Sequence, residues 1–159
     1  MQIFIELTIG FVMAIIIYNV LHHFLVTIPD RKYQIAVKKQ VDNEVFQIIS
    51  ELKDEKSVLV IDRFINSSVL TSVWGRGVMV FEYRCHVKND YDLKFTRTTI
   101  DNKLRQQAIQ DDFIDENGNV KLILTDCWLN NHILVFDVAD ERNRATYEYV
   151  KDIKKMDEK

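Results

Sequence analysis

The sequence predicts an α+β protein: an N-terminal transmembrane helix, followed by one small domain with a mainly antiparallel, curved sheet packed by helices. Three observations support this prediction. An apolar run covers residues 7–28, strand-like alternation recurs between residues 57 and 138, and apolar residues at helical spacing flank and interrupt the strands. The predicted division is an anchor over residues 1–28 and a soluble α+β domain over residues 29–159.

The apolar run has the length and composition of a membrane span. A helix needs roughly 20 mainly apolar residues to cross a hydrocarbon layer of about 30 Å, and residues 7–28 meet that requirement. Thr8 is the only polar side chain in the first half of the run, whereas a helix of a soluble core usually keeps a polar stripe. The side chains expected to face lipid are Leu7, Phe11, Ile15, Ile16, Ile17 and Leu21.

Two other interpretations of the N-terminus fit less well. A cleaved signal peptide is disfavoured because residues 1–6 hold no Lys or Arg and no small-x-small site follows the run. Residues 3–8 resemble the mature N-terminus of type IV pilins, an apolar helix with a Glu near its start, here Glu6. The basic leader and the Gly that precede the pilin cleavage point are missing, so a retained anchor is the prediction.

The charges around the run predict the orientation of a single-pass protein of the cell membrane. No Lys or Arg precedes the run, whereas Arg31, Lys32, Lys38 and Lys39 follow it closely. The positive-inside rule therefore places the C-terminal domain in the cytoplasm. An extracellular domain is the alternative, because envelope proteins with this layout often face outward.

A small group of residues in the run is predicted to contact a second helix. Asn19, His22 and His23 fall within about 100° of one another on a helical wheel, and Gly10 lies further up. Polar side chains inside a span tend to face protein, so the group suggests another membrane protein or a second copy of the chain as a partner. The alternative is that the three polar residues lie at the level of the lipid headgroups.

The domain is predicted to begin with a helix and a strand-rich region. Apolar residues spaced by three and four predict an amphipathic helix over residues 33–53, which continues the anchor after a kink near Pro29. Strand patterns follow, and Gly75-Arg76-Gly77 joins the second strand to the third as a hairpin turn. The four predicted strands cover residues 57–65, 69–74, 78–87 and 91–97.

The second half of the domain is predicted to hold a helix, a hairpin and a last helix. The first of these helices begins near Thr99 or Asp101, and the last covers residues 141–156. Between them, residues 120–129 and 132–138 flank a tight Asn130-Asn131 turn, with Cys127 opposite Leu134, Thr125 opposite Phe136 and Trp128 opposite Ile133. Apolar side chains on both faces predict a central, doubly covered hairpin, and the element content is similar to that of cystatin-like and NTF2-like folds.

Composition narrows the classes of ligand. The formal charge of −3, with both signs interspersed, leaves no basic face for nucleic acid. The two cysteines, Cys85 and Cys127, are interpreted as buried free thiols, with a bridge between neighbouring strands as the alternative. Together with His86 and His132 they lack the spacing of a zinc site, and no metal or cofactor is expected.

Enzymatic motifs are missing as well. Gly75-Arg76-Gly77 is followed by a strand and not by the helix that a phosphate loop needs, and residues 115–119 lack the ligand spacing of a calcium loop. No Gly-x-Ser-x-Gly, kinase or P-loop pattern occurs. The sequence therefore predicts a non-catalytic protein.

The function predicted from these observations is that of a membrane-anchored protein-interaction module. Trp74 and Arg76 are its candidate partner contacts, because an aromatic residue and an Arg at a loop end are common hot-spot types. In size and layout the chain is similar to prophage-encoded superinfection-exclusion proteins, which stop phage DNA entry. The alternatives are a subunit of a conjugation or competence machine, and a membrane-tethered ligand sensor or enzyme with a cystatin-like or NTF2-like pocket.

Overall fold

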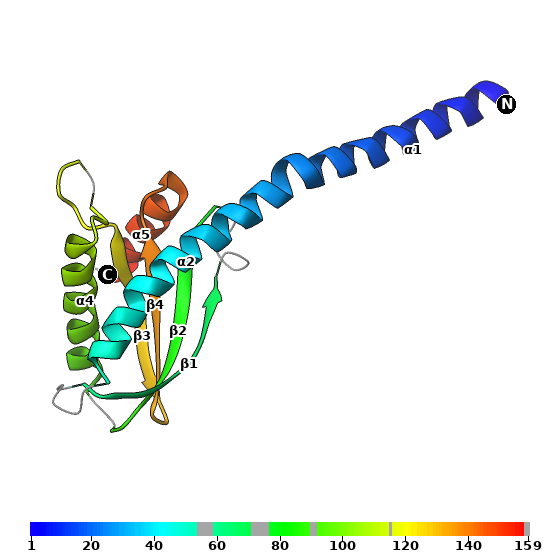
Figure 1. Ribbon diagram of the computed structural model, residues 1–159. Coiled ribbons are helices and arrows are strands. Elements are labelled where there is room, and N and C mark those ends of the chain that lie inside the picture. The colour runs from blue at the N-terminus through cyan, green and yellow to red at the C-terminus, as the bar shows by residue number, and fades with distance from the viewer. Residues whose placement is uncertain (54–58, 71–76, 90–91, 115, 158–159) are drawn as a thin grey trace. The chain divides into compact units, whose positions relative to one another are not determined.

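The computed structural model describes residues 1–53, 59–70, 77–89, 92–114 and 116–157. The chain divides into two compact units, Met1–Ala36 and Val37–Lys159. Its elements follow in the order α1 (Gln2–His22), η1 (His23–Thr27), α2 (Ile28–Glu51), β1 (Ile61–Val69), β2 (Val80–Val87), α4 (Leu93–Gln110), β3 (Leu122–Asn130), β4 (Ile133–Asp140) and α5 (Arg144–Asp157) (Figure 1).

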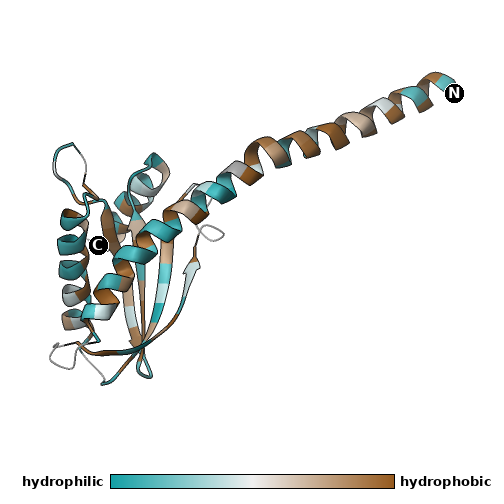
Figure 2. Ribbon diagram, viewed as in Figure 1, coloured by the Kyte–Doolittle hydropathy of each residue, from teal (hydrophilic) through white to brown (hydrophobic). Residues whose placement is uncertain are grey.

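The first unit is a helix with apolar side chains on every side. No residue of α1 is buried, and Figure 2 shows that much of its ribbon has the colour of hydrophobic residues. Within the described part of the chain, this is the one helix long and apolar enough to cross a membrane. The predicted span residues are all exposed on it, with between 45% and 71% of each side chain accessible: Leu7, Phe11, Ile15, Ile16, Ile17 and Leu21.

The helix continues through Pro29, near which the sequence predicts a kink. The π-helical turn η1 ends at Thr27, and α-helical geometry resumes at Ile28, one residue before Pro29, and lasts to Glu51. Proline has no backbone N–H to donate to the preceding turn, so a local change in the helical hydrogen-bond pattern accommodates it. The helix predicted over residues 33–53 therefore begins earlier, as α2, and follows α1 without an intervening loop.

The second unit has three layers. Its four-stranded antiparallel sheet has the order β1-β2-β4-β3. Buried side chains of α2 and α4 pack on one face, which we call the inner face, and α5 packs on the opposite, outer face (Figure 1). This arrangement confirms the predicted α+β fold: a long N-terminal apolar helix, then an antiparallel sheet packed with helices.

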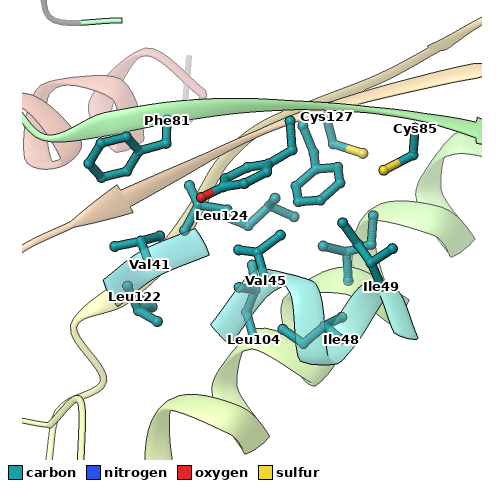
Figure 3. Packing of buried hydrophobic residues seen from close by; sticks show 14 of the residues in the cluster. Val41, Val45, Ile48, Ile49, Phe81, Cys85, Leu104, Leu122, Leu124 and Cys127 are labelled. Atoms are coloured by element: carbon teal, nitrogen blue, oxygen red, sulfur yellow. The ribbon is translucent and has the colours of Figure 1, made fainter. Parts of the chain in front are cut away.

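The core fills the space between the inner face and the two helices. Alternate residues of β2 point inward, and Phe81 and Tyr83 are fully buried there beside Phe136 of β4. Figure 3 shows Phe81 on the sheet side of this cluster and Leu104 of α4 on the helix side, together with four residues of α2: Val41, Val45, Ile48 and Ile49. Aromatic and aliphatic side chains thus fill the space between the sheet and these two helices.

Two of the predicted strands differ from the structure. The strand predicted over residues 91–97 is wrong: α4 begins at Leu93, because the Asp92 side chain caps the helix by accepting a 2.9 Å hydrogen bond from the Phe95 amide. Most of the strand predicted over residues 69–74 lies outside the described residues. Pairing extends as far as Leu70, whose amide donates to the Val80 carbonyl at 2.9 Å.

The predicted hairpin exists, but its register and position differ. Asn131 and His132 have positive φ values of 49° and 61°, so the two-residue turn lies one residue later than predicted. Cys127 therefore pairs with Phe136, and Trp128 pairs with Val135. The prediction of a central, doubly covered hairpin is also wrong, because β3 forms an edge of the sheet and only β4 is central.

Candidate partner-binding surface

The two residues predicted to contact a partner, Trp74 and Arg76, lie outside the described residues. The structure begins again at Gly77, which has a φ of +87° and whose carbonyl accepts a 3.0 Å hydrogen bond from the Asn143 side chain. The nearest atom to a methyl group placed on Gly77 would be the Ala145 Cβ, at 3.6 Å.

The predicted helix-contact residues lie on α1 and at the start of η1. A methyl group placed on Gly10 would have nothing within 4 Å, so this part of the helix surface is open to a neighbour. The His22 ring lies 5.8 Å from that of Tyr18, and the His23 ring packs edge-on against Phe24 at the same distance. Asn19 lies one turn before His23, whose amide donates to its carbonyl.

The outer face of the sheet carries a set of side chains that sequence analysis did not assign to a site. Because β2 buries alternate residues in the core, the residues between them project outward, and the strand register aligns them with residues of β4 and β3. Among the described helices only α5 packs on this face, at the end marked by Val80 and Ala139. The remaining part, here called the outer patch, comprises Glu82, Arg84, His86, Asp126, Trp128, Ile133, Val135 and Asp137.

The central row of the outer patch combines the residue types that dominate protein interfaces. Arg84 of β2 and Trp128 of β3 pair with Val135 of β4 from opposite sides. The Arg84 side chain is 48% exposed and donates through Nε to Glu82 Oε1 at 2.8 Å. Val135 is only 5% exposed, because neighbouring side chains cover it. The centre of the outer patch is therefore an apolar residue whose strand neighbours carry a guanidinium group (Arg84) and an indole ring (Trp128).

An acidic row borders this centre on the side of α5. Glu82, Asp137 and Asp126 are aligned across β2, β4 and β3 by the strand register. Asp137 is 7% exposed, and its Oδ1 atom has no hydrogen-bond partner among the described residues. Burial, followed by the charges of Glu82 and Asp126, raises the pKa of Asp137 to about 7, and Arg84 opposes the shift.

A β-bulge places an additional polar side chain beside Asp137. The register of β3 shifts between Leu124 and Asp126, so Thr125 is the extra residue. Its Oγ1 donates to the Asp137 carbonyl at 3.3 Å, and Tyr149 of α5 hydrogen-bonds the Thr125 side chain. The same environment, mainly burial, raises the pKa of Tyr149. This end of the patch is therefore held by contacts from two strands and a helix.

The opposite border of the patch contains two histidines at the hairpin end. The rings of His86 and His132 stack at 6.2 Å with an interplanar angle of 19°. His86 Nδ1 lies 4.0 Å from the Asp62 carboxylate, and Ile133, which pairs with His86, is 37% exposed. An apolar, aromatic and charged surface thus extends across three strands.

The sequence contained part of the signal for this patch. Alternation along residues 78–87 separates Glu82, Arg84 and His86 from the buried residues, so their common direction was predictable. The hairpin prediction also placed Trp128 on the face away from Cys127. The pattern did not show which helix covers which face. It therefore did not show that the described helices cover only one end of this side.

The thiols do not take part in a surface site. Cys85 and Cys127 are both free and buried, and burial raises their pKa values to about 12 and about 11. The bridge considered as an alternative is not formed, because β4 lies between β2 and β3 and keeps the two residues apart. Among the described residues, no three His, Cys, Asp or Glu side chains form a group that could hold a metal ion.

The chain was compared with known protein families, curated proteins and solved structures. No protein family, curated protein or solved structure matches the chain.

Proposed function

We propose that this protein is a single-pass, membrane-anchored, non-catalytic interaction module that binds another protein through the outer patch. The observation that carries the proposal is the pairing of Arg84 and Trp128 around Val135 on a sheet face that α5 covers at one end only. Arg and Trp are enriched at the centres of interfaces because they offer large contact areas and directional polar groups.

Membrane anchoring is supported by the helix that precedes the domain. Its apolar side chains are exposed on all sides, which is unfavourable in water because each buried Å² of apolar surface is worth roughly 25 cal/mol. A bilayer removes this surface from water and leaves the backbone hydrogen bonds within the helix. Gly10 and the polar residues Asn19, His22 and His23 provide the candidate contact with another membrane protein or a second copy.

The interaction module is favoured over a ligand sensor with a cystatin-like or NTF2-like pocket. The inner face is packed by large side chains such as Phe81, Tyr83 and Phe136, whereas the outer patch presents residues typical of interfaces. Superinfection exclusion, and the alternative of a conjugation or competence subunit, remain predictions from size and layout.

Anchoring is tested by extraction of membranes with alkaline carbonate after expression of the full chain. The unmodified protein is expected in the membrane pellet. Ile15→Asp with Ile16→Asp should move it to the soluble fraction, since each Asp costs about 3 kcal/mol at the centre of a span. The matched control is Phe95→Asp with Ile109→Asp, two exposed apolar residues of α4, which should leave the protein in the pellet.

The predicted cytoplasmic location of the domain is tested by thiol labelling in intact cells. Asn130 is exposed at the hairpin turn, so Asn130→Cys offers a reactive site, while Cys85 and Cys127 are buried. A maleimide that cannot cross the membrane should label the variant only after lysis. Labelling in intact cells would place the domain outside and favour an envelope role.

Partner binding is tested by photo-cross-linking from the outer patch. A benzophenone amino acid replacing Trp128 should give a discrete adduct with one protein, and Arg84→Ala should reduce the yield at least several-fold. The control position is Tyr147, which is 47% exposed on α5. Equal yields from positions 128 and 147, or no effect of Arg84→Ala, would argue against the outer patch as the binding surface.

A further inference from the structure

A second polar site lies away from the outer patch, where α2, the end of α4 and the segment after β4 meet. It is a cavity of about 290 Å³, here called the Glu44 pocket. Its lining is almost entirely polar and includes three carboxyl groups. The lining residues are Gln40, Asn43, Glu44, Asp111, Asp112, Phe113 and Arg142.

Glu44 is a buried acid, and one of its two carboxyl oxygens lacks a hydrogen-bond partner among the described residues. Its side chain belongs to α2, the residue is 7% exposed, and the oxygen without a partner is Oε2. A buried polar atom left unpaired costs on the order of 1–3 kcal/mol, so such atoms are uncommon in folded proteins. The position of this one in the lining of a cavity indicates that a ligand can complete its contacts.

The acid next to Glu44 shares its proton. Burial, and then a hydrogen bond to Asp111, raise the pKa of Glu44 to about 7, while Gln107 opposes the shift. The pKa of Asp111 is lowered, first by the hydrogen bond from Glu44 and then by one from Gln107. Gln107 Nε2 donates to Asp111 Oδ2 at 2.6 Å. A carboxyl-carboxylate pair of this kind binds one positive charge, which in the empty pocket is the proton.

The resident cation is already engaged by other groups. Arg142 donates from Nε to both Asp140 oxygens at 2.9 Å, and from Nη2 to Gln40 at 2.8 Å. Its guanidinium group also lies 4.7 Å from the centre of the Phe113 ring. Because Asp140 neutralises Arg142, the carboxyl groups of Glu44, Asp111 and Asp112 leave the pocket with an excess of negative charge.

We propose that the Glu44 pocket binds a small organic cation with N–H donors, namely a primary ammonium group on a short alkyl chain. The ammonium group donates to Glu44 Oε2 and Asp111, and it replaces the proton that these two acids share. Ligand sites in proteins have volumes of roughly 300 to 1,000 Å³. The Glu44 pocket, with a volume of about 290 Å³, is at the lower end of this range, and it therefore favours a ligand of few atoms. A metal ion is disfavoured because no three suitable side chains group together among the described residues.

The test is a titration of the full chain, dissolved in a non-ionic detergent, with n-butylammonium. Binding is monitored by the NMR chemical shifts of the backbone amides of residues 111–113. The amine keeps its charge between pH 6 and pH 8, whereas Glu44 loses its proton in this range. The groups facing Glu44 are Gln107 of α4 and Asp111, the residue that follows the end of α4, with Asp112 and Arg142 in the same lining. Affinity should therefore rise about tenfold from pH 6 to pH 8, as a group with a pKa near 7 requires.

Substitutions in the pocket and alternative ligands test whether the ammonium group binds to Glu44 and Asp111. Glu44→Gln should weaken binding at least tenfold, and Asp111→Asn provides a second variant at an accessible position if the first fails to fold. The control is Glu51→Gln, because Glu51 is an exposed acid of α2 paired with Lys103. A blocked Ala-Lys-Ala peptide distinguishes a lysine side chain from a free amine as the source of the ammonium group. Equal binding of n-butanol, preferential binding of Mg²⁺, or unchanged affinity in Glu44→Gln and Asp111→Asn would each overturn the proposal.

Discussion

Tyr83 and Asp42 join the centre of the sheet to α2 by a hydrogen bond of 2.8 Å from the phenol to Asp42 Oδ1. Tyr83 is fully buried, and its pKa is raised by burial and then by the nearby Asp42 charge. Lys38 also contacts Asp42, at 2.6 Å, and donates to Ser67 of β1 at 2.5 Å. One carboxylate thus links a helix and two strands.

Removal of the phenol oxygen should therefore destabilise the domain. Tyr83→Phe keeps the ring, which stacks on Phe136 at 5.5 Å, and deletes only the donor to Asp42. We expect the free energy of unfolding to fall by about 1.5–3 kcal/mol, the range for hydrogen bonds to charged groups. Denaturant unfolding followed by circular dichroism measures the change. Tyr147→Phe removes an exposed phenol and should alter stability by less than about 0.5 kcal/mol; equal effects would contradict the role of the Asp42 contact.

The inner layer of the domain could be predicted from sequence because its signals are periodic. Val41, Val45, Ile48 and Ile49 of α2 follow helical spacing, and all four are buried as the spacing indicates. The start of α4 was not predicted, because Leu93 and Phe95 alternate with polar residues as a strand would. The longer series Thr96, Ile100, Leu104 and Ala108, at intervals of four, contains the helical signal that the short window missed.

The candidate sites were harder to predict because they depend on tertiary burial. Glu44 is an acid on an amphipathic helix, where exposure is the usual outcome, and only its packing beside Gln107 and Asp111 makes it unusual. Asp137 is a single acid within an apolar stretch of β4, but the acidic row requires the order β2-β4-β3, which one sequence does not specify. The extra residue Thr125 likewise follows from the bulge and not from a local pattern.

The acidic row predicts a dependence of stability on pH. The pKa of Asp137 is about 7 in the folded domain and near 3.8 when unfolded, so the folded state holds more protons between these values. Its contribution to stability is therefore present below about pH 4 and is lost as pH rises through 7. Asp137→Asn supplies a permanent donor to the neighbouring carboxylates and should raise the free energy of unfolding on the order of 2 kcal/mol at pH 8.

Comparison of two pH values separates this effect from a general change in packing. At pH 4 the Asn variant and the unmodified chain should unfold at nearly the same denaturant concentration, since Asp137 is then protonated in the folded state. Glu148→Gln on α5 is the control, because it removes an exposed acid outside the row. A gain for Asp137→Asn that is equal at pH 4 and pH 8 would contradict the titration of Asp137.

The start of α5 depends on one amide side chain. Asn143 Oδ1 accepts from the Thr146 amide at 2.8 Å, and Nδ2 donates to the Gly77 carbonyl at 3.0 Å. Thr146 Oγ1 in turn accepts from the Met79 amide at 2.8 Å. Asn143→Ala should cost about 1–2 kcal/mol of unfolding free energy, as loss of a helix cap does, whereas Asn143→Asp keeps the cap and loses only the donor to Gly77. Stability is measured by thermal or denaturant unfolding. If both variants lost the same unfolding free energy, the loss would come from the hydrogen bond to the Gly77 carbonyl and not from the helix cap.

The buried thiols predict slow chemical modification of the folded protein. Cys85 and Cys127 lie in the core cluster, and burial raises both pKa values well above neutrality, so neither access nor thiolate formation favours reaction. At pH 7.5 a disulfide reagent such as dithionitrobenzoate should modify the full chain in detergent at least a hundredfold more slowly than the same chain in 6 M guanidinium. Asn130→Cys provides an exposed thiol in the same molecule and should react within seconds to minutes. Rapid loss of two thiols without denaturant would mean that the inner face opens readily, and would contradict the close packing of Tyr83 and Phe136 around them.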